Sequence, residues 1–209
     1  LPMLVLPVAA AADALPDICQ LGNTWVPEFA ELNALQSLQP FVEASEIVDR
    51  EDYFDGIWDT NVVDRHVYGV PWYVDTRLLF YRKDLLAAAG YAQPPQTWAE
   101  WNAAMTAIKR QRGKDQYAIL LPLNEFEQLL SLALQQGDPL LIDGRSNLDS
   151  AGFRRALGFY VGMFEQGFAP PMSETQISNV WDEFFNGMFV FYVSGPWNIR
   201  EFRKRAPDH

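Results

Sequence analysis

The sequence contains few of the residues that most often build catalytic and metal sites. Among 209 residues it has one cysteine, Cys19, and two histidines, His66 and His209. A single cysteine cannot form an intrachain disulfide, and a nucleophilic cysteine needs an activating base, which only the two histidines could supply. Two histidines and one cysteine give no zinc-binding spacing. We therefore expect no cysteine catalysis, no metal and no cofactor, and we expect Cys19, in the apolar run DICQL, to be buried.

Basic residues are also scarce. The chain has 16 Lys and Arg against 27 Asp and Glu, which gives a formal net charge of −11. Phosphate binding needs clustered Lys and Arg, so we expect no nucleic-acid partner. The densest basic run lies at Arg200–Arg205, and we interpret it as the solvated face of a terminal helix.

A hydrophobic run long enough to span a membrane is missing as well. The most conspicuous apolar stretch is LPMLVLPVAAAA, at residues 1–12, whereas a membrane-spanning helix needs roughly 20 residues. No basic segment precedes it, as one would in a signal peptide. We interpret this stretch as the end of a helix that leads into a strand at Asp17. If the protein is secreted, we expect its export signal to lie outside the given sequence.

The remaining pattern alternates between segments typical of strands and segments typical of helices, without an internal repeat. This alternation favours a layered α/β architecture. The predicted strands are Ile18–Leu21, Val70–Val74, Leu78–Tyr81, Tyr117–Leu121, Leu140–Ile142 and Met188–Val193. A short helix is predicted after the strand Leu78–Tyr81 and is stopped by Gly90. The other predicted helices run from Pro27 to about Ala34, from Thr97 toward Gly113, over Glu125–Gln136, Ser150–Gln166 and Gln176–Asn186, and onward from Pro196. Between them, residues 38–67 are expected to form short helices and loops.

The best-marked helix begins at Thr97. Thr97 and Glu100 have the spacing of a capping box, in which the hydroxyl accepts from the Glu100 amide and the carboxylate reaches back to the Thr97 amide. Apolar residues then recur on one helical face: Trp98, Trp101, Met105 and Ile108.

The segment that contains this helix start, GVPWYVDTRLLFYRKDLLAAAGYAQPPQTWAEW (Gly69–Trp101), resembles a known family. In the maltose-binding-protein-like family 1 extracellular solute-binding proteins, the sugar-binding subunits of ABC importers, the crossover reads G-(I/V)-P, an acidic residue, L-x-Y-N-x-D-L, A-G and P-P-x-T-W-x-E. Nearly every element is present. Arg82 stands where the family usually has Asn, which we interpret as a surface change.

Further segments resemble the same family in the same order along the chain. DICQLGNTWVPEFAELNALQSLQPF (Asp17–Phe41) is similar to its early strand, ligand loop and helix. GFYVGMFEQGFAPP (Gly158–Pro171) and NGMFVFYVSGPWNI (Asn186–Ile199) are similar to its late helix and to the strand that ends in S-G-P-W.

The resemblance implies a periplasmic-binding-protein-like two-lobe α/β fold of the class II type. It assigns residues 1–74 to part of the N-terminal lobe, 75–77 to the hinge crossover and 78–209 to part of the C-terminal lobe. Family members begin with a strand–helix–strand unit upstream of the position of Leu1, and they return to the first lobe after S-G-P-W-N-I. We therefore expect an incomplete chain with only the middle part of the fold.

Candidate ligand-binding residues lie after the predicted strands and at the crossover, since open α/β sheets bind ligands at strand ends. Sugar recognition needs aromatic faces, together with carboxylates or amides that pair with hydroxyl groups. By resemblance, Trp25 and Trp197 are the stacking faces and Asp75 and Glu125 accept hydroxyl hydrogen bonds. The full set is Asn23, Thr24, Trp25, Asp75, Asn124, Glu125, Phe126, Gly195 and Trp197. We expect Trp72 and Tyr73, near the crossover, to pack on the sheet instead.

Purely structural roles remain open for several candidates. Asn23 or Thr24 could cap the helix that begins near Pro27, and Asn124 could cap the helix that follows it. Asp75, a lone carboxylate between two apolar runs, could be satisfied by backbone amides at the hinge.

The resemblance implies an extracytoplasmic carbohydrate-binding protein that is not an enzyme. It would deliver a mono- or oligosaccharide to an ABC transporter permease, as a monomer in the periplasm or outside the cell, with lipid anchoring to the membrane as an open alternative. A glycoside hydrolase is a second possibility and would need two carboxyl groups about 5–5.5 Å or about 6.5–9.5 Å apart. Asp75, Glu125 and Asp182 are nominal carboxylates, but no local motif pairs them. A third possibility is a polyamine- or iron-binding protein; the T-W-x-E and S-G-P-W elements favour sugars.

Overall fold

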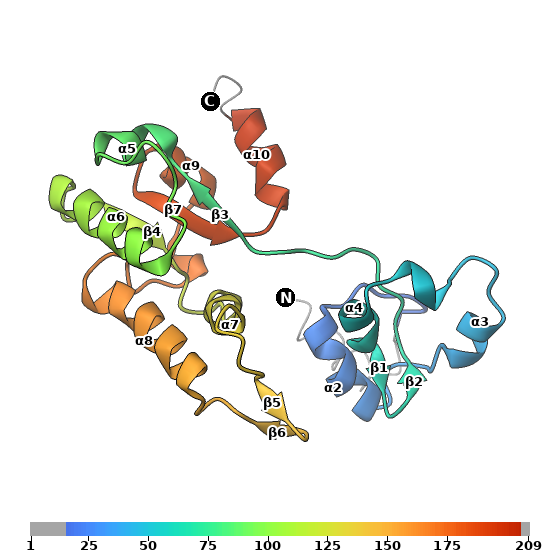
Figure 1. The fold of residues 1–209 in the computed structure, drawn as a ribbon. Coiled ribbons are helices and arrows are strands. Elements are labelled where there is room, and N and C mark those ends of the chain that lie inside the picture. The colour runs from blue at the N-terminus through green and yellow to red at the C-terminus, as the bar shows by residue number, and fades with distance from the viewer. Residues whose placement is uncertain (1–15, 206–209) are drawn as a thin grey trace. The chain divides into compact units, whose positions relative to one another are not determined.

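A computed structural model describes residues 16–205 of the chain. The chain divides between Val74 and Asp75 into two compact units, here called the first and the second unit, and each is described by itself (Figure 1). The helix expected at residues 1–12 lies outside the described residues. The division does not test the lobe assignments, which remain predictions.

The first unit consists of short elements, as predicted for residues 38–67. Its helices are η1 (Asn23–Trp25), α2 (Val26–Glu31), α3 (Gln39–Glu43), η2 (Arg50–Asp52) and α4 (Asp55–Asp59). A small hairpin joins β1 (Val62–Val63) to β2 (His66–Val67). The hairpin turns through Asp64 and Arg65, whose φ angles of 48° and 67° match the two left-handed residues of a type I′ turn.

The predicted strand at Ile18–Leu21 is wrong. No regular secondary structure forms there, Ile18 is 91% exposed, and Cys19 is exposed rather than buried. A β-strand needs a neighbouring strand for its backbone hydrogen bonds, and no strand among residues 16–205 pairs with this segment.

The predicted strand at Val70–Val74 is wrong for the same reason. The segment has no regular structure. Trp72 and Tyr73 are 78% and 61% exposed, so neither packs on a sheet as expected. Gln20 Nε2 donates a hydrogen bond to Tyr73 Oη at 3.2 Å, which connects two irregular segments of the first unit.

The second unit is built on a three-stranded sheet of β3 (Leu78–Tyr81), β4 (Tyr117–Leu120) and β7 (Phe189–Ser194). The strand order is β3-β7-β4. The central strand β7 runs antiparallel to β3 and parallel to β4. The apolar run FVFYVS makes β7 suitable for a central position, because such a strand is covered on both faces.

Helices follow the strands at positions close to those predicted. They are α5 (Lys83–Ala88), α6 (Trp98–Gln111), α7 (Glu127–Leu134), α8 (Ala151–Glu165), η3 (Glu174–Gln176), α9 (Val180–Phe185) and α10 (Trp197–Arg205), with a β5 (Leu141–Ile142) and β6 (Arg145–Ser146) hairpin after α7. The run Arg200–Arg205 lies on α10, as expected. No helix within residues 16–205 combines the length and the apolar character needed to cross a membrane.

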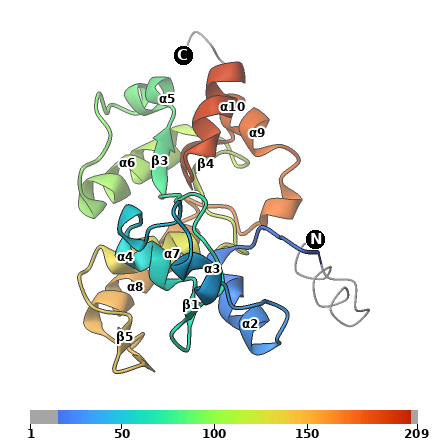
Figure 2. The ribbon, with the colours of Figure 1, turned by 90° about the vertical axis from the view of Figure 1, so that its right-hand side faces the viewer.

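Two hydrophobic clusters hold the second unit together. The larger packs α6, α7 and α8 against β4 and β7, and Trp101, Met105 and Ile108 are buried in it as the helical pattern predicts. The smaller contains Phe184 and Phe189, with Phe202 packed against it. It joins α9 to α10, which lie side by side in Figure 2.

The cap of α6 forms at Thr97, with one change from the expected geometry. Thr97 Oγ1 accepts from the Glu100 amide at 3.2 Å, as predicted. The Glu100 carboxylate accepts from the Gln96 amide at 2.7 Å rather than from that of Thr97. Gly90 and Gly167 follow α5 and α8 with φ angles of 93° and 67°, which is the left-handed conformation that ends a helix.

Candidate functional site

Three segments of the second unit meet at one edge of its sheet. The parallel strands β4 and β7 both end there, and the antiparallel strand β3 begins there, with Leu78 paired to Ser194. The residues before β3, after β4 and after β7 therefore come to the same edge. This edge receives Asp75, the loop Asn124–Phe126 and the turn Gly195–Trp197. The register thus brings the segments that carry the second-unit candidates to the same edge of the sheet.

Trp197 opens α10 at this edge and is 47% exposed. Its indole lies directly over the Cα atom of Gly195, because a Cβ atom added at Gly195 would overlap the ring. Glycine is needed here for close approach rather than for an unusual backbone angle. One face of the Trp197 ring therefore packs against the backbone of Gly195, and the S-G-P-W element presents an aromatic surface.

Asn198 fixes the turn that carries Trp197. It is buried, and its Nδ2 donates to Ser194 Oγ at 2.9 Å and to the Gly195 carbonyl at 3.0 Å. Its Oδ1 accepts from Trp181 Nε1 at 2.7 Å. The sequence reasoning missed Asn198, although its place directly after the S-G-P-W element was the available signal.

Arg77 is a second residue that the sequence reasoning missed. Its guanidinium lies 5.7 Å from the centroid of the Trp197 ring, within the range of a cation–π contact. The same side chain forms an ion pair of 3.1 Å with Glu127 at the start of α7. Arg77 therefore connects the beginning of β3, the beginning of α7 and the aromatic surface.

The loop after β4 presents an amide, a carboxylate and an aromatic ring. Asn124 is exposed, Glu125 is half-buried, and Phe126 is 54% exposed. Asn124 is not the N-cap residue of α7, since that position is held by Phe126, whose side chain makes no capping hydrogen bond. The buried Gln128 donates to the Glu125 carboxylate through Nε2, which orients that carboxylate.

Burial, with a smaller contribution from the negative charge of Glu125, raises the pKa of Tyr160 on α8. Gln128 Oε1 is also buried, and no described residue donates a hydrogen bond to it. The Gln128 amide of α7 is thus buried and the Tyr160 hydroxyl of α8 is partly buried, and Gln128 contacts Glu125.

Asp75 is exposed and precedes β3 by three residues. The segment before it is not a strand, so Asp75 does not lie between two strands as the sequence pattern predicts. Within residues 16–205 no backbone amide donates to its side chain. The hinge-amide alternative is therefore not supported, and a ligand contact by Asp75 remains a prediction.

Asn23, Thr24 and Trp25 form the 3-10 turn η1 of the first unit. Asn23 and Thr24 are exposed and Trp25 is half-buried. The N-cap residue of α2 is Trp25, and neither η1 nor α2 has a side-chain cap. The capping alternative for Asn23 and Thr24 is therefore wrong, and ligand contact by these three residues remains untested.

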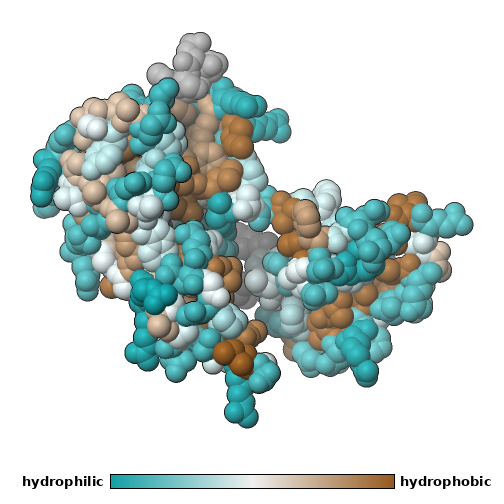
Figure 3. All heavy atoms as spheres, viewed as in Figure 1, coloured by the Kyte–Doolittle hydropathy of each residue, from teal (hydrophilic) through white to brown (hydrophobic). Residues whose placement is uncertain are grey.

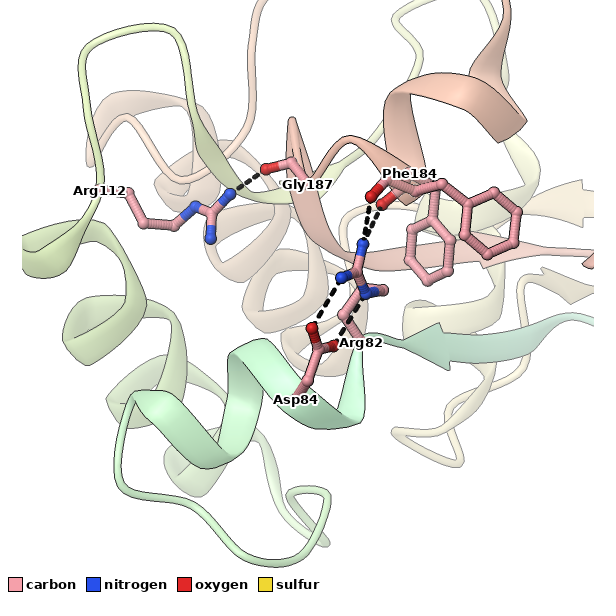
Figure 4. A network of polar contacts seen from close by, with 6 residues as sticks. Arg82, Asp84, Arg112, Phe184 and Gly187 are labelled. Atoms are coloured by element: carbon pink, nitrogen blue, oxygen red, sulfur yellow. Dashed lines mark hydrogen bonds and ion pairs between the residues drawn. The ribbon is translucent and has the colours of Figure 1, made fainter. Parts of the chain in front are cut away.

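Arg82 is not the surface change that the family pattern suggests. Figure 4 shows it between β3 and the end of α9, where Nη1 donates to the carbonyls of Phe184 at 2.9 Å and Phe185 at 2.6 Å. Nε and Nη2 donate to the Asp84 carboxylate at 2.8 and 2.7 Å. These hydrogen bonds hold the pKa of Asp84 below its usual value.

Arg112, in the same view, donates to the Gly187 carbonyl, and burial lowers its pKa. A cavity of about 180 Å³ lies beside it between α5 and α6 and is lined by Leu85, Ala88, Ala89, Ile108, Gln111, Arg112 and Gln116. These residues lie at the opposite edge of the sheet from Trp197 and include no sequence candidate. The cavity is therefore not the predicted site.

Of the three nominal carboxylates of a hydrolase, Asp75 and Glu125 lie in the loops before β3 and after β4, and Asp182 lies on a helix. Asp182 forms an ion pair of 2.5 Å with Arg205 of α10. In the part of the chain that the structure describes, no group of three or more His, Cys, Asp or Glu side chains is arranged to hold a metal ion.

Comparison with known proteins agrees with this architecture. The family model for bacterial extracellular solute-binding proteins matches residues 3–208. The solved structure of the sugar-binding protein MalE from Xanthomonas citri is 64% identical and superimposes with a TM-score of 0.78, covering 99% of this chain and 53% of that one. The α/β fold of periplasmic binding proteins, present in part, is thus confirmed.

Two curated relatives are named for sugars. The diacetylchitobiose binding protein DasA of Streptomyces coelicolor is 27% identical over 136 residues, which are 65% of this chain and 31% of that protein. The galactooligosaccharide-binding protein of Bacillus subtilis is 24% identical over 160 residues, 72% of this chain and 37% of that protein. The chain spans at most about half the length of the curated relatives it matches.

The match of the family model extends over almost the whole sequence and over both units. The chain belongs to the family of bacterial extracellular solute-binding proteins.

Proposed function

We propose that the protein containing this chain binds a mono- or oligosaccharide outside the cytoplasm and delivers it to the permease of an ABC transporter. Membership of an extracellular solute-binding family supports the location and the binding role. The names of the relatives, which include a sugar-binding protein and a galactooligosaccharide-binding protein, support the class of ligand.

The half-exposed indole of Trp197 is the observation that carries the proposal. A flat aromatic ring with a rigid backing suits the apolar C–H face of a sugar ring. In the loop after β4, at the same edge of the sheet, the Glu125 carboxylate and the Asn124 amide can pair with sugar hydroxyls, and Phe126 adds a second exposed ring. Gly195 keeps the backing of Trp197 free of a side chain.

The proposal includes the candidates of the first unit and of the crossover. Trp25 would supply a further stacking face, while Asn23, Thr24 and Asp75 would bind hydroxyl groups. The relatives are named as binding proteins, which favours binding without turnover over glycoside hydrolysis. A monomeric state, the permease partner and any lipid anchor belong to the same proposal.

The test is Trp197→Ala in the full-length gene product, titrated calorimetrically with diacetylchitobiose, a galactooligosaccharide and maltose. Loss of one aromatic contact should weaken sugar binding by about 1–3 kcal/mol. Trp98→Phe is the control, because Trp98 stacks on Phe159 of α8 and is not one of the candidate residues.

Unchanged affinity after Trp197→Ala would remove this residue from the site. A thermal-shift screen of the wild-type protein should include polyamines and ferric citrate beside the sugars, because a ligand that binds the folded state raises the melting temperature. Stabilisation by one of these controls and by no sugar would contradict the proposed ligand class.

A further inference from the structure

The Trp197 ring makes a packing contact with a glycine backbone and a cation–π contact with an arginine. The ring covers the Cα atom of Gly195, and the guanidinium of Arg77 lies 5.7 Å from its centroid. Within residues 16–205, Trp197 Nε1 donates no hydrogen bond to a protein acceptor. The bonds of Asn198 fix the backbone turn, but they do not fix the rotation of a half-exposed side chain. The Arg77 guanidinium is thus a contact that can restrict that rotation.

Arg77 is itself held in place. Its side chain is only 23% exposed, and its Nη2 atom lies 3.1 Å from Glu127 Oε1. Glu127 stands in the first turn of α7, where a negative charge is favoured by the helix dipole. A planar guanidinium can lie over an aromatic ring while it pairs with a carboxylate, which the point charge of a lysine does less well.

We propose that Arg77 is a positioning residue that holds the Trp197 indole in one orientation, and that Glu127 holds Arg77. The contacts join three chain segments that come from β3, α7 and α10. The consequence for affinity rests on the proposed function: a sugar would meet an aromatic face that is already ordered, and less conformational entropy would be lost on binding.

The direct test measures the environment and the mobility of the Trp197 ring in the absence of ligand. The full-length protein is labelled with 5-fluorotryptophan, and the ¹⁹F resonance of Trp197 is assigned by its loss in Trp197→Phe. In Arg77→Ala this resonance should shift and broaden while the other tryptophan resonances keep their positions. Arg110→Ala is the matched control, because Arg110 is exposed on α6 and has no contact with the edge.

Two more conservative variants keep the proposal testable if Arg77→Ala does not fold. Glu127→Gln leaves Arg77 in place but removes its ion pair, so it should broaden the Trp197 resonance less than Arg77→Ala does. Arg77→Lys keeps the charge and should lie between wild type and Arg77→Ala. A Trp197 resonance that is unchanged in folded Arg77→Ala, or in Glu127→Gln if Arg77→Ala does not fold, would overturn the proposal.

Titration with diacetylchitobiose, a galactooligosaccharide and maltose then tests the consequence for binding. A cation–π contact at an exposed site corresponds to a change in affinity of about two- to five-fold, and Arg77→Ala should lose about that much. If the wild-type protein binds none of the probes, the proposed function fails, whereas the fluorine spectrum still decides whether Arg77 orients Trp197. A shifted resonance with unchanged affinity would support the positioning and overturn its role in sugar recognition.

Discussion

At the scale of single residues, the contact between the Trp197 ring and the backbone of Gly195 is the main feature of the candidate site. The S-G-P-W motif predicts that Gly195 permits close approach and that Trp197 faces a ligand, and the structure adds that the group approaching Gly195 is the Trp197 ring itself. Arg77 and Asn198 escaped prediction because their roles lie in contacts with other parts of the chain, such as Glu127 and Trp181.

Gly195→Ala tests this arrangement. The new methyl group would occupy the position of the Trp197 ring, which must swing away. Because the ring is half exposed, the move should cost little stability, but sugar affinity should fall about as far as in Trp197→Ala, by about 1–3 kcal/mol. Calorimetric titration and a thermal melt measure the two effects.

The control for Gly195→Ala is Gly158→Ala. Gly158 lies inside α8, and a Cβ atom there would meet nothing within 4 Å. This change should leave sugar binding intact and should stabilise the helix by about 0.5–1 kcal/mol. Wild-type affinity in Gly195→Ala would show that the position of the Trp197 ring is not important for binding.

At the scale of elements, local signals were reliable for helices. The Thr97 hydroxyl caps α6 and the apolar face of α6 is buried, both as predicted, because a helix forms its hydrogen bonds within one segment. Helix ends were less accurate: the helix predicted from Gln176 begins only at Val180, where Asn179 Oδ1 accepts from the amides of Trp181 and Asp182. Strands depended on a partner, and the segments Ile18–Leu21 and Val70–Val74 found none.

Arg82→Asn should destabilise the second unit. Arg82 donates to two carbonyl groups in the last turn of α9, where carbonyls lack partners within the helix. The Phe184 carbonyl also accepts from the Gly187 amide at 3.1 Å. Asn, the usual family residue, is too short to reach these two carbonyl groups, so we expect a loss of about 1–3 kcal/mol in the free energy of unfolding.

Urea unfolding of the full-length protein measures this loss. Arg110→Asn provides the comparison, since the exposed Arg110 lies in the last turn of α6 and should lose only helix propensity, about 0.5 kcal/mol. Equal midpoints for the two variants would show that the Arg82 bonds contribute no net stability.

At the scale of the whole molecule, buried apolar residues are unevenly distributed. Both hydrophobic clusters consist of residues of the second unit. Among the described residues of the first unit, the buried apolar side chains are Val26, Phe29, Ala30, Trp58 and Val67. Apolar colour reaches the surface of both units in Figure 3, and in the first unit the exposed residues include Ile18, Phe41 and Phe54.

Limited proteolysis of the 209-residue chain with chymotrypsin should therefore cut the first unit and the segment around Trp72 and Tyr73 before it cuts the second unit. Cleavage needs a locally opened backbone, and segments with few buried contacts open most easily. Mass spectrometry should find a resistant product that begins at about residue 73–75. Early cuts inside α6 or β7 would contradict this order of stability.

The sequence by itself determined the family, the α/β class and most elements of the second unit, because motifs, caps and helical periodicity are local. It also placed candidate residues after the strands that end at one sheet edge. The tertiary structure alone decided which apolar runs become strands and which polar side chains hold the site. Those outcomes depend on distant partners, such as the Phe184 carbonyl, which lies 102 residues from Arg82, and the Ser194 that pairs with Leu78. The local sequence of a segment does not specify which distant segment it will contact, so these contacts can be identified only in the folded chain.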